Sequence, residues 1–216
     1  MTTLLLIRHA TTAATGRRLG GRTDAPLDAA GRAQAEAAAQ RLADVPLRAV
    51  YASPLRRSVE TAEVIAAGHR LAVRPCPGVI EVDYGRWTDR PLGQVARTKQ
   101  WGVIQAYPSL VAFAEGESIR AMQLRAVDTV EALVAAHRRD TVAVVSHADV
   151  IKALVAFYVS LPLDAFQRLE VAPASVSVLR LAPGSRPALL RLNDDGPLAA
   201  ARFRRPRSAR KGGSRG

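Results

Sequence analysis

Three short apolar stretches of this 216-residue chain are each followed, within a few residues, by arginine or histidine. LLLI at 4–7 is followed by Arg8 and His9, RAVYA at 48–52 runs into SPLRRSVET at 53–61, and TVAVVS at 141–146 is followed by His147. Short apolar runs of this kind are typical of buried strands in a parallel sheet. Ligands of open α/β sheets bind beyond the carboxyl ends of the strands, so the three ends are predicted to meet at one site.

Two histidines and an arginine at one site would suit a bound phosphoryl group. Arginine stays charged and donates a planar fork of hydrogen bonds to phosphate oxygens. A single strand-end histidine is as readily structural as catalytic, so the convergence of three ends carries the prediction. His69 and His137 stand near predicted helix C-termini, where a cation suits the helix dipole, and are interpreted as structural.

Helical patterns connect these strands. A helix is predicted within 28–46, with Asp28 as its N-cap and Pro46 as its stop, and a second within 55–68, with Gly68 as the residue just past its end. The stretch 117–139 predicts a long helix with one apolar face formed by Ile119, Met122, Ala126, Val130 and Leu133.

Strands that alternate with helices indicate an α/β domain with a mostly parallel central sheet and helices on both faces. The segments 168–171, 175–182 and 187–192 are expected to be hairpin strands that add an antiparallel edge. The region 83–115 is irregular and is predicted to cover one end of the sheet. We expect a single domain over residues 1–195 and a basic C-terminal tail over 196–216.

Composition limits the class of protein. Hydrophobic residues make up 48% of the chain and charged residues 23%, as in ordinary globular proteins. The one cysteine, Cys76, cannot form an internal disulfide, which fits a reducing compartment. No stretch is long and apolar enough for a signal sequence or a membrane span, so a cytoplasmic protein without membrane contact is expected.

The basic charge is concentrated at the C-terminus. The net charge is +12, and residues 202–216 hold seven of the 31 basic residues and no acidic one. Without them, 24 basic residues remain against 19 acidic ones, which is a net charge of +5. A segment rich in Gly, Ser and Arg cannot bury a core, so a disordered, solvated tail is favoured over a contact with nucleic acid or another polyanion.

The motifs, taken in order, resemble those of the histidine phosphatase superfamily, also called the phosphoglycerate mutase-like family. The resemblance covers about residues 3–182, and it includes LLLIRHATT, LGGRTDAPLDAAGRAQA, YASPLRRSVETA, EVDYGRW and VVSHADVI. It is most similar to an actinobacterial-type subgroup described as probable phosphomutases. The implied fold is a phosphoglycerate mutase-like three-layer α/β sandwich.

Carried over residue by residue, the resemblance implies five catalytic residues. His9 would be the nucleophile that takes the phosphoryl group, while Arg8, Arg57 and His147 would bind its oxygens. Glu81, in EVDYGRW, would donate a proton to the leaving alcohol, with Asp83 ranked second for that role. Arg56 would be an exposed neighbour of Arg57.

Other residues are expected to shape the phosphate and substrate end of the site. Thr12 and Thr15 follow the nucleophile, and Gly21 and Arg22 lie on the next loop. Ser118 begins the predicted long helix, where it could contact substrate or cap the helix.

Three positions depart from the family pattern. Ala10 and Ala148 follow the two histidines, where the family usually has glycine, and Trp87-Thr88-Asp89 replaces Trp-Glu-Gly. An alanine is costly only where the backbone needs a positive φ or approaches the phosphate closely. These departures bear on substrate preference more than on the five catalytic residues.

The resulting hypothesis is a phosphatase or phosphomutase for a small organic phosphomonoester, with phosphatase favoured because water outcompetes a second substrate in an open site. The scheme requires no cofactor and no metal, and the sequence holds no HExxH or CxxC ligand motif. The alternative is a catalytically weak member that binds nucleic acid or another polyanion through 202–216. The identity of the phosphomonoester and the oligomeric state, a homodimer included, stay open.

Overall fold

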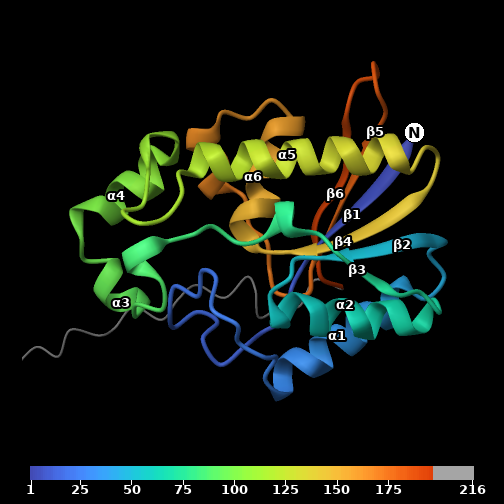
Figure 1. Ribbon diagram of the computed structural model, residues 1–216, viewed down its shortest axis with the longest axis horizontal. Helices are drawn as coiled ribbons and strands as arrows, with labels where there is room; N and C mark the ends of the chain where they lie inside the picture. The colour runs from blue at the N-terminus through green and yellow to red at the C-terminus, as the bar shows by residue number, and fades with distance from the viewer. Residues whose placement is uncertain (197–216) are drawn as a thin grey trace, which may run out of the picture.

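A six-stranded sheet in the order β3-β2-β4-β1-β5-β6 forms the centre of the protein (Figure 1). The computed structural model describes residues 1–196. Neighbours among β1 to β4 are parallel, whereas β5 runs antiparallel to β1 and β6 antiparallel to β5. The predicted mostly parallel sheet with an antiparallel edge is therefore confirmed. The strands are β1 Thr2–Arg8, β2 Leu47–Ala52, β3 Val73–Pro75, β4 Thr141–Ser146, β5 Val176–Leu181 and β6 Ala188–Asp194.

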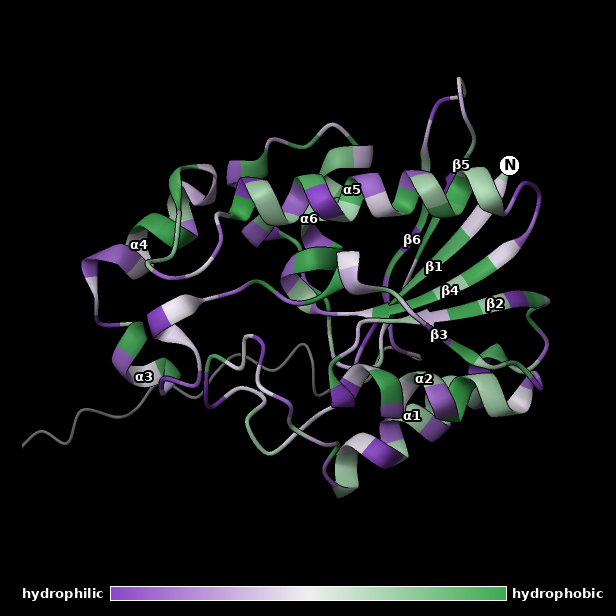
Figure 2. Ribbon diagram, in the orientation of Figure 1, coloured by the Kyte–Doolittle hydropathy of each residue, from purple (hydrophilic) through white to green (hydrophobic). Residues whose placement is uncertain are grey.

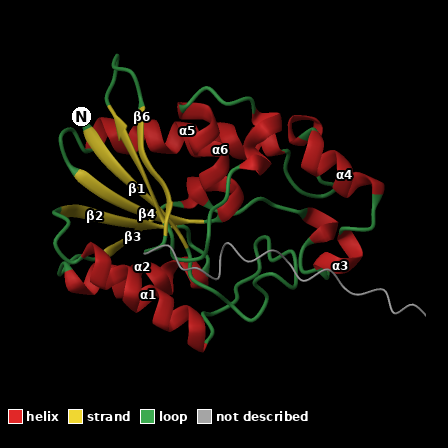
Figure 3. Cartoon of the chain, turned by 180° about the vertical axis from the view of Figure 1, so that it is seen from behind, coloured by secondary structure: helices red, strands yellow, loops and turns green. Residues whose placement is uncertain are grey.

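Helices cover both faces of the sheet, which gives the three layers expected of this fold class. Two views from opposite sides place α1 and α2 on one face and α5 and α6 on the other (Figures 1 and 3). The α-helices are α1 Ala29–Leu42, α2 Arg56–Gly68, α3 Leu92–Val95, α4 Lys99–Ala106, α5 Ile119–Ala136 and α6 Ala148–Tyr158. Short 3₁₀ turns are η1 Pro77–Val79, η2 Gly85–Trp87, η3 Pro108–Leu110 and η4 Leu163–Arg168.

The alternation of side chains along β1 produces two cores. Leu4 and Leu6 pack with residues of α5 and α6, whereas Leu5 and Ile7 pack on the other face with residues of α2. Successive side chains of a strand point to opposite faces, so a strand with helices on both sides must be apolar throughout. Figure 2 shows this as hydrophobic colour along the middle of β1 and β4.

Two predicted helix starts are present as expected. Asp28 caps α1 by accepting a hydrogen bond from the backbone N–H of Gly31, at 2.7 Å. On α5, the predicted apolar face is buried at Ile119, Met122, Ala126 and Val130, and half-buried at Leu133.

The predicted strand at 168–171 is wrong. Arg168 is the last residue of η4, and the backbone N–H of Leu169 closes that turn on the carbonyl of Phe166. The carbonyl of Val171 accepts a hydrogen bond from the Arg8 side chain, and the N–H of Ala172 donates to the Asn193 side chain. Side chains thus take backbone groups that a strand ladder would have used. The other two late segments form β5 and β6.

Gly68 is not the residue past the end of α2. It is the last helical residue, His69 is the C-cap, and the left-handed conformation falls on Arg70, with φ 56°. Pattern reading also missed β3, whose three residues are too few to carry an alternation. The irregular region 83–115 contains η2, α3, α4 and η3 at one end of the molecule (Figure 1).

The predicted basic tail at 202–216 lies outside the described residues. Within residues 1–196, no helix has the length and apolar character that crossing a bilayer requires.

Candidate active site

The register of the parallel strands brings the two histidines together. Arg8, the last residue of β1, pairs with Ser146, the last residue of β4, so His9 and His147 leave the sheet side by side. Their ring centroids are 5.1 Å apart, and the His9 N–H donates to the Ser146 carbonyl at 2.9 Å. The predicted convergence of strand ends is therefore a consequence of β1–β4 pairing.

His9 is unprotonated at its Nε2 atom. Its Nδ1 lies 2.8 Å from the carbonyl oxygen of Ala10, which can only accept, so Nδ1 carries the proton. Arg57 Nε donates to His9 Nε2 at 3.2 Å, and that bond requires an unprotonated Nε2. The backbone next to the histidine thus selects the tautomer that a nucleophile needs.

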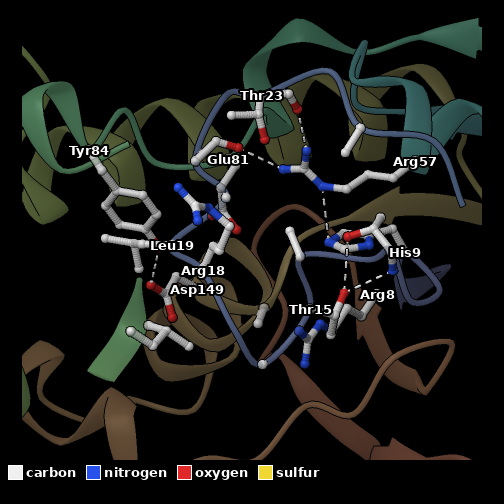
Figure 4. Close-up of a pocket in the computed structure, with 18 of the residues that line it drawn as sticks. Arg8, His9, Thr15, Arg18, Leu19, Thr23, Arg57, Glu81, Tyr84 and Asp149 are labelled. Carbon is white, nitrogen blue, oxygen red and sulfur yellow. Dashed lines mark hydrogen bonds between the residues drawn. The ribbon is translucent and has the colours of Figure 1, made fainter. Parts of the chain in front are cut away.

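Arg57 is held by bonds to two loop carbonyls. It lies in the first turn of α2 and is 4% exposed. Its Nη1 donates to the Thr23 carbonyl at 2.6 Å and its Nη2 to the Gly21 carbonyl at 2.7 Å (Figure 4). These bonds place the guanidinium between the loop and both histidines. There it could donate a hydrogen bond to a phosphate oxygen.

His147 has the opposite tautomer. Arg57 Nη2 lies 3.2 Å from its Nδ1, which must accept because a guanidinium only donates. Its Nε2 therefore carries the proton and donates to Ser53 Oγ at 2.8 Å. His147 is fully buried and N-terminal to α6, so its ring is fixed before any ligand arrives.

Arg8 has a donor to spare. Its Nη1 donates to the Val171 carbonyl at 2.7 Å, but its buried Nε has no hydrogen-bond partner among the described residues. An unpaired buried N–H is costly, so a hydrogen bond from this Nε to a ligand in the cavity would be favourable. Arg8 lines the same cavity as His9 and Arg57.

Burial and neighbouring cations keep both histidines neutral. Desolvation, followed by the charges of Arg57 and Arg8, lowers the pKa of His9 well below 6.5. Desolvation and the same cations, together with His9, lower the pKa of His147 well below 6.5. The lowered pKa leaves the His9 imidazole neutral across the physiological pH range, which is the state a nucleophilic imidazole needs.

Glu81 is a buried carboxyl group, 8% exposed, in the segment between η1 and η2. Its Oε1 accepts from the Val82 N–H at 3.0 Å, and its Oε2 lies 3.9 Å from His147 Nδ1. Burial and the charge of Asp149 raise the pKa of Glu81 to about 7, against the opposing charges of Arg57 and Arg8. A carboxyl group with that pKa can donate and accept protons near neutral pH.

Most of these groups line a cavity of about 410 Å³. Arg8, His9, Arg57 and Glu81 are in its lining. His147 is not in the lining, and it contacts the lining residue Arg57. Apolar side chains from β1–α1 and from the 83–115 region form another part of the lining, namely Leu19, Leu92, Trp101, Ile104 and Phe113.

Three further predicted residues lie at this cavity. Thr12 and Thr15 line it and contact each other, with Oγ1 atoms 3.2 Å apart. Gly21 also lines it, with φ 51°, and supplies the carbonyl that holds Arg57. A side chain at Gly21 would press on Tyr84 and Thr88 as well as strain the backbone.

Arg22 and Ser118, predicted at the substrate end, do not line the cavity. Arg22 pairs with Asp83 and Glu117, each at 3.2 Å, and its Nε donates to the Glu81 carbonyl. It therefore fixes the segment that carries Glu81. Ser118 caps α5 by accepting from the Ala121 N–H at 3.0 Å, so the capping alternative holds. Asp83, the second choice for proton donor, is also absent from the lining.

The backbone accommodates both alanines that depart from the family pattern. Neither Ala10 nor Ala148 has a positive φ, so neither needs glycine. The Ala10 N–H donates to Thr61 Oγ1 at 3.1 Å, and Ala148 begins α6. At the third departure, Asp89 has φ 61° and pairs with Arg18 at 2.7 Å, at the outer rim of the cavity.

Pattern reading missed Tyr84, Asp149 and Lys152, which all line the cavity. Tyr84 and Asp149 are joined by a hydrogen bond (Figure 4). The signal available in the sequence was the helical spacing of Asp149 and Lys152, which puts them on one face of α6 directly after His147.

A doubly covered α/β sheet with paired arginines and histidines at the carboxyl ends of its strands defines a phosphoryl-binding enzyme site. The chain belongs to the histidine phosphatase superfamily (branch 1), whose family model matches residues 4–195.

Relatives in this family carry phosphatase names. Phosphoserine phosphatase 1 of Hydrogenobacter thermophilus is 31% identical over 89% of this chain and 92% of its own length. An acid phosphatase of Mycobacterium tuberculosis is 34% identical over 85% and 88%. The solved structure of a mycobacterial glucosyl-3-phosphoglycerate phosphatase is 27% identical, with a TM-score of 0.81 over 89% and 98%. Other relatives are named probable phosphoglycerate mutases. Because both curated relatives above and the solved structure carry phosphatase names, the comparisons support a phosphatase more than a mutase.

Proposed function

We propose that this protein is a metal-independent phosphatase for small organic phosphomonoesters that works through a phosphohistidine at His9. The observation that carries the proposal is the unprotonated His9 Nε2, flanked by Arg57 and by the unpaired Nε of Arg8, at the inner end of the cavity. A nucleophile with an unprotonated nitrogen and two cations around it fits an incoming phosphoryl group.

In the first step, His9 Nε2 attacks phosphorus, a P–N bond forms, and the P–O bond to the alcohol breaks. Arg8, Arg57 and His147 stabilise the charge on the phosphoryl oxygens. Glu81 transfers its proton to the leaving oxygen, so an alcohol rather than an alkoxide departs. A pKa of about 7 leaves a useful fraction of Glu81 protonated for this transfer.

In the second step, water attacks phosphorus while the Glu81 carboxylate takes up a water proton. The P–N bond breaks, inorganic phosphate forms, and both His9 and Glu81 return to their starting states. A phosphomutase would differ only in using a substrate hydroxyl in place of water. The names of the relatives support water as the acceptor.

The test is phosphate release from para-nitrophenyl phosphate in the presence of EDTA. We expect the wild type to be active and His9→Ala to lose at least about 10³-fold in kcat. A rapid quench without acid, followed by mass spectrometry, should find the phosphoryl group on His9. EDTA-sensitive release, or release that His9→Ala retains, would contradict the proposal.

The substrate class can then be narrowed by ranking kcat/KM over a panel of monoesters, because this ratio reports differential binding of transition states. Phosphoserine and 3-phosphoglycerate belong in the panel because relatives or their complexes carry these names. The cavity offers Arg18 and Lys152 as cations beyond the phosphate end, which favours substrates with a second polar group. Excess phosphate release over phosphoryl transfer to a second alcohol would identify the phosphatase.

A further inference from the structure

Asp149 is a second carboxyl group in the cavity that carries Glu81. It lies in the first turn of α6, two residues after His147, and its side chain is 18% exposed. Lys152 Nζ is 3.9 Å from its Oδ1, and Tyr84 donates to its Oδ2 at 2.9 Å. A carboxylate in the first turn is also favoured by the helix dipole. Asp149 therefore places a negative charge at a defined point of the site.

Tyr84 holds the Asp149 carboxylate in position. The Tyr84 side chain is 6% exposed, and its ring packs edge-on against Phe113, with centroids 5.1 Å apart. Within residues 1–196 its hydroxyl makes one hydrogen bond, in which it donates to Asp149. Burial and the nearby Asp149 raise the pKa of Tyr84 well above 10. The Tyr84 hydroxyl therefore keeps its proton and remains a hydrogen-bond donor. Its bond to Oδ2 fixes the position of the Asp149 carboxylate.

The remaining charges around Glu81 oppose its role as an acid. Arg8 at the end of β1 and Arg57 on α2 both favour its ionised form. Arg22 from the loop and Arg125 from α5 donate to the Glu81 backbone carbonyl, at 3.3 and 3.2 Å. The other titratable groups facing it are His147, Asp149 and Tyr84, and both histidines of the site are neutral. Arg22 and Arg125 are paired with Asp83 and Glu117. Asp149 is the carboxylate whose charge favours the protonated form of Glu81.

We propose that Asp149 is a positioning residue that keeps Glu81 protonated for the phosphoryl transfer step, with Tyr84 fixing the Asp149 carboxylate in place. The inference rests on the proposed function, because it assigns Glu81 the acid role. Figure 4 shows the arrangement, with Arg57 on one side of Glu81 and the Tyr84–Asp149 pair on the other. Burial is the largest cause of the raised Glu81 pKa, and Asp149 is the second.

The test compares the pH dependence of kcat/KM in Asp149→Asn and the wild type. The pH dependence of this ratio reports the ionisation of groups in the free enzyme that are needed up to the first phosphoryl transfer. Glu81 must be protonated for that transfer. The substrate is the alkyl monoester with the highest kcat/KM in the panel, because an alkyl leaving group needs the proton. Removing the Asp149 charge makes Glu81 easier to ionise, so the alkaline limb should move to lower pH by roughly half a unit to one unit.

Three variants separate charge from structure. Asp149→Glu keeps the charge and should keep the limb near its wild-type position. Glu170→Gln removes a different carboxylate at the cavity wall and should leave the limb unmoved. Tyr84→Phe loses the hydrogen bond but retains the Asp149 charge, so its limb should move less than that of Asp149→Asn. Asp149→Ser removes the charge and serves as the neutral variant if the amide prevents folding.

The outcomes distinguish this inference from the proposed function. If the wild type shows His9-dependent turnover in EDTA but Asp149→Asn and Asp149→Ser leave the limb in place, the role of Asp149 is wrong and the phosphatase proposal stands. If Tyr84→Phe and Asp149→Glu move the limb as far as Asp149→Asn, a structural disturbance of α6 is responsible, which also overturns the inference. Loss of His9 dependence would instead overturn the proposed function.

Discussion

Arg56 and Arg57 are adjacent in the chain but have opposite surroundings. The Arg56 side chain is 57% exposed and pairs with Glu60 one turn along α2, as expected for an outer-face residue. Arg57 is buried among both histidines and two carbonyls. The difference follows from the 100° between successive helical residues, so that only one of the two can face the site.

The pair supplies a matched test of phosphate binding. Arg57→Lys keeps the charge but loses the planar fork, and we expect kcat/KM to fall by about 10²-fold or more. Arg56→Lys should stay within about twofold, because an exposed ion pair contributes little. Initial rates with one monoester check both values. Equal losses in the two variants would contradict the assignment of Arg57.

Activity should decline as pH rises through about 7, where Glu81 loses its proton. No acid limb from His9 is expected in the ordinary range, because its pKa lies well below 6.5. A pH profile of kcat/KM with an alkyl monoester measures both features. Glu81→Gln should lower kcat/KM strongly for the alkyl monoester and less for para-nitrophenyl phosphate, since nitrophenolate leaves without a proton in the first step. An equal loss on both substrates would contradict the acid role.

The raised pKa of Glu81 should lower the free energy of unfolding at alkaline pH. This pKa is about 7 in the folded protein and near 4.5 in the unfolded chain. The folded state therefore holds the proton more tightly, and stability falls as pH rises from the lower value through the higher one. Glu81→Gln removes this cost, so the variant should be more stable than the wild type by roughly 1–3 kcal/mol at pH 8.

Denaturant unfolding at two pH values measures the difference between Glu81→Gln and the wild type. At pH 5 the two proteins should have nearly equal free energies of unfolding, because Glu81 is then protonated in the fold. A stability difference independent of pH would mean that burial does not raise the pKa of this group.

At the scale of elements, α1 packs closely against the loop that follows the nucleophile. A Cβ on Gly31 would overlap the backbone carbonyl oxygen of Thr11, whereas a Cβ on Gly102 of α4 would meet open space. Both glycines lie within helices. Space beside the helix, rather than helix propensity, therefore distinguishes the two positions.

Gly31→Ala should destabilise the fold by about 2 kcal/mol or more, since α1 or the loop must shift. Gly102→Ala should be neutral or stabilise by up to about 1 kcal/mol, because alanine is the better helix former. Thermal unfolding of both variants measures this contrast. A change of the same sign in the free energy of unfolding of both variants would contradict the close packing of α1 on the loop.

At the scale of the whole molecule, the cavity and the basic C-terminal segment are separate in the chain. The lining residues run from Arg8 to Glu170, whereas seven basic residues lie within 202–216. Deletion of 202–216 lowers the net charge from +12 to +5 and removes none of the lining residues found within the described part of the chain. The deletion therefore distinguishes a phosphatase from a polyanion-binding protein.

We expect the 202–216 deletion to retain kcat and to change kcat/KM by no more than a few fold, through weaker steering of anionic substrates. Fluorescence anisotropy with labelled RNA provides the second measurement. Tight, salt-dependent RNA binding that the deletion removes, in a protein without His9-dependent turnover, would favour the polyanion alternative.

The sequence alone determined the elements that have strong local signals. The strands β1, β2 and β4 and the cap at Asp28 follow from apolar runs and side-chain chemistry that act over a few residues. The sequence motifs also indicated the family, and His9, Arg57 and His147 were assigned from those motifs. The loop at 168–171 escaped prediction because the distant side chains of Arg8 and Asn193 bond to its backbone. The strand β3 has three residues, too few for an alternation, and the left-handed residue after α2 is Arg70 rather than a glycine.

Only the tertiary structure decided which polar side chains share the cavity. Strand register places His9 beside His147, and the packing of α6 brings in Asp149, while ion pairs with Asp83 and Glu117 keep Arg22 outside. The neutral state of the histidines and the raised pKa of Glu81 also depend on burial. The physical reason is that desolvation and charge–charge interactions depend on distances through space, which connect residues far apart in the chain.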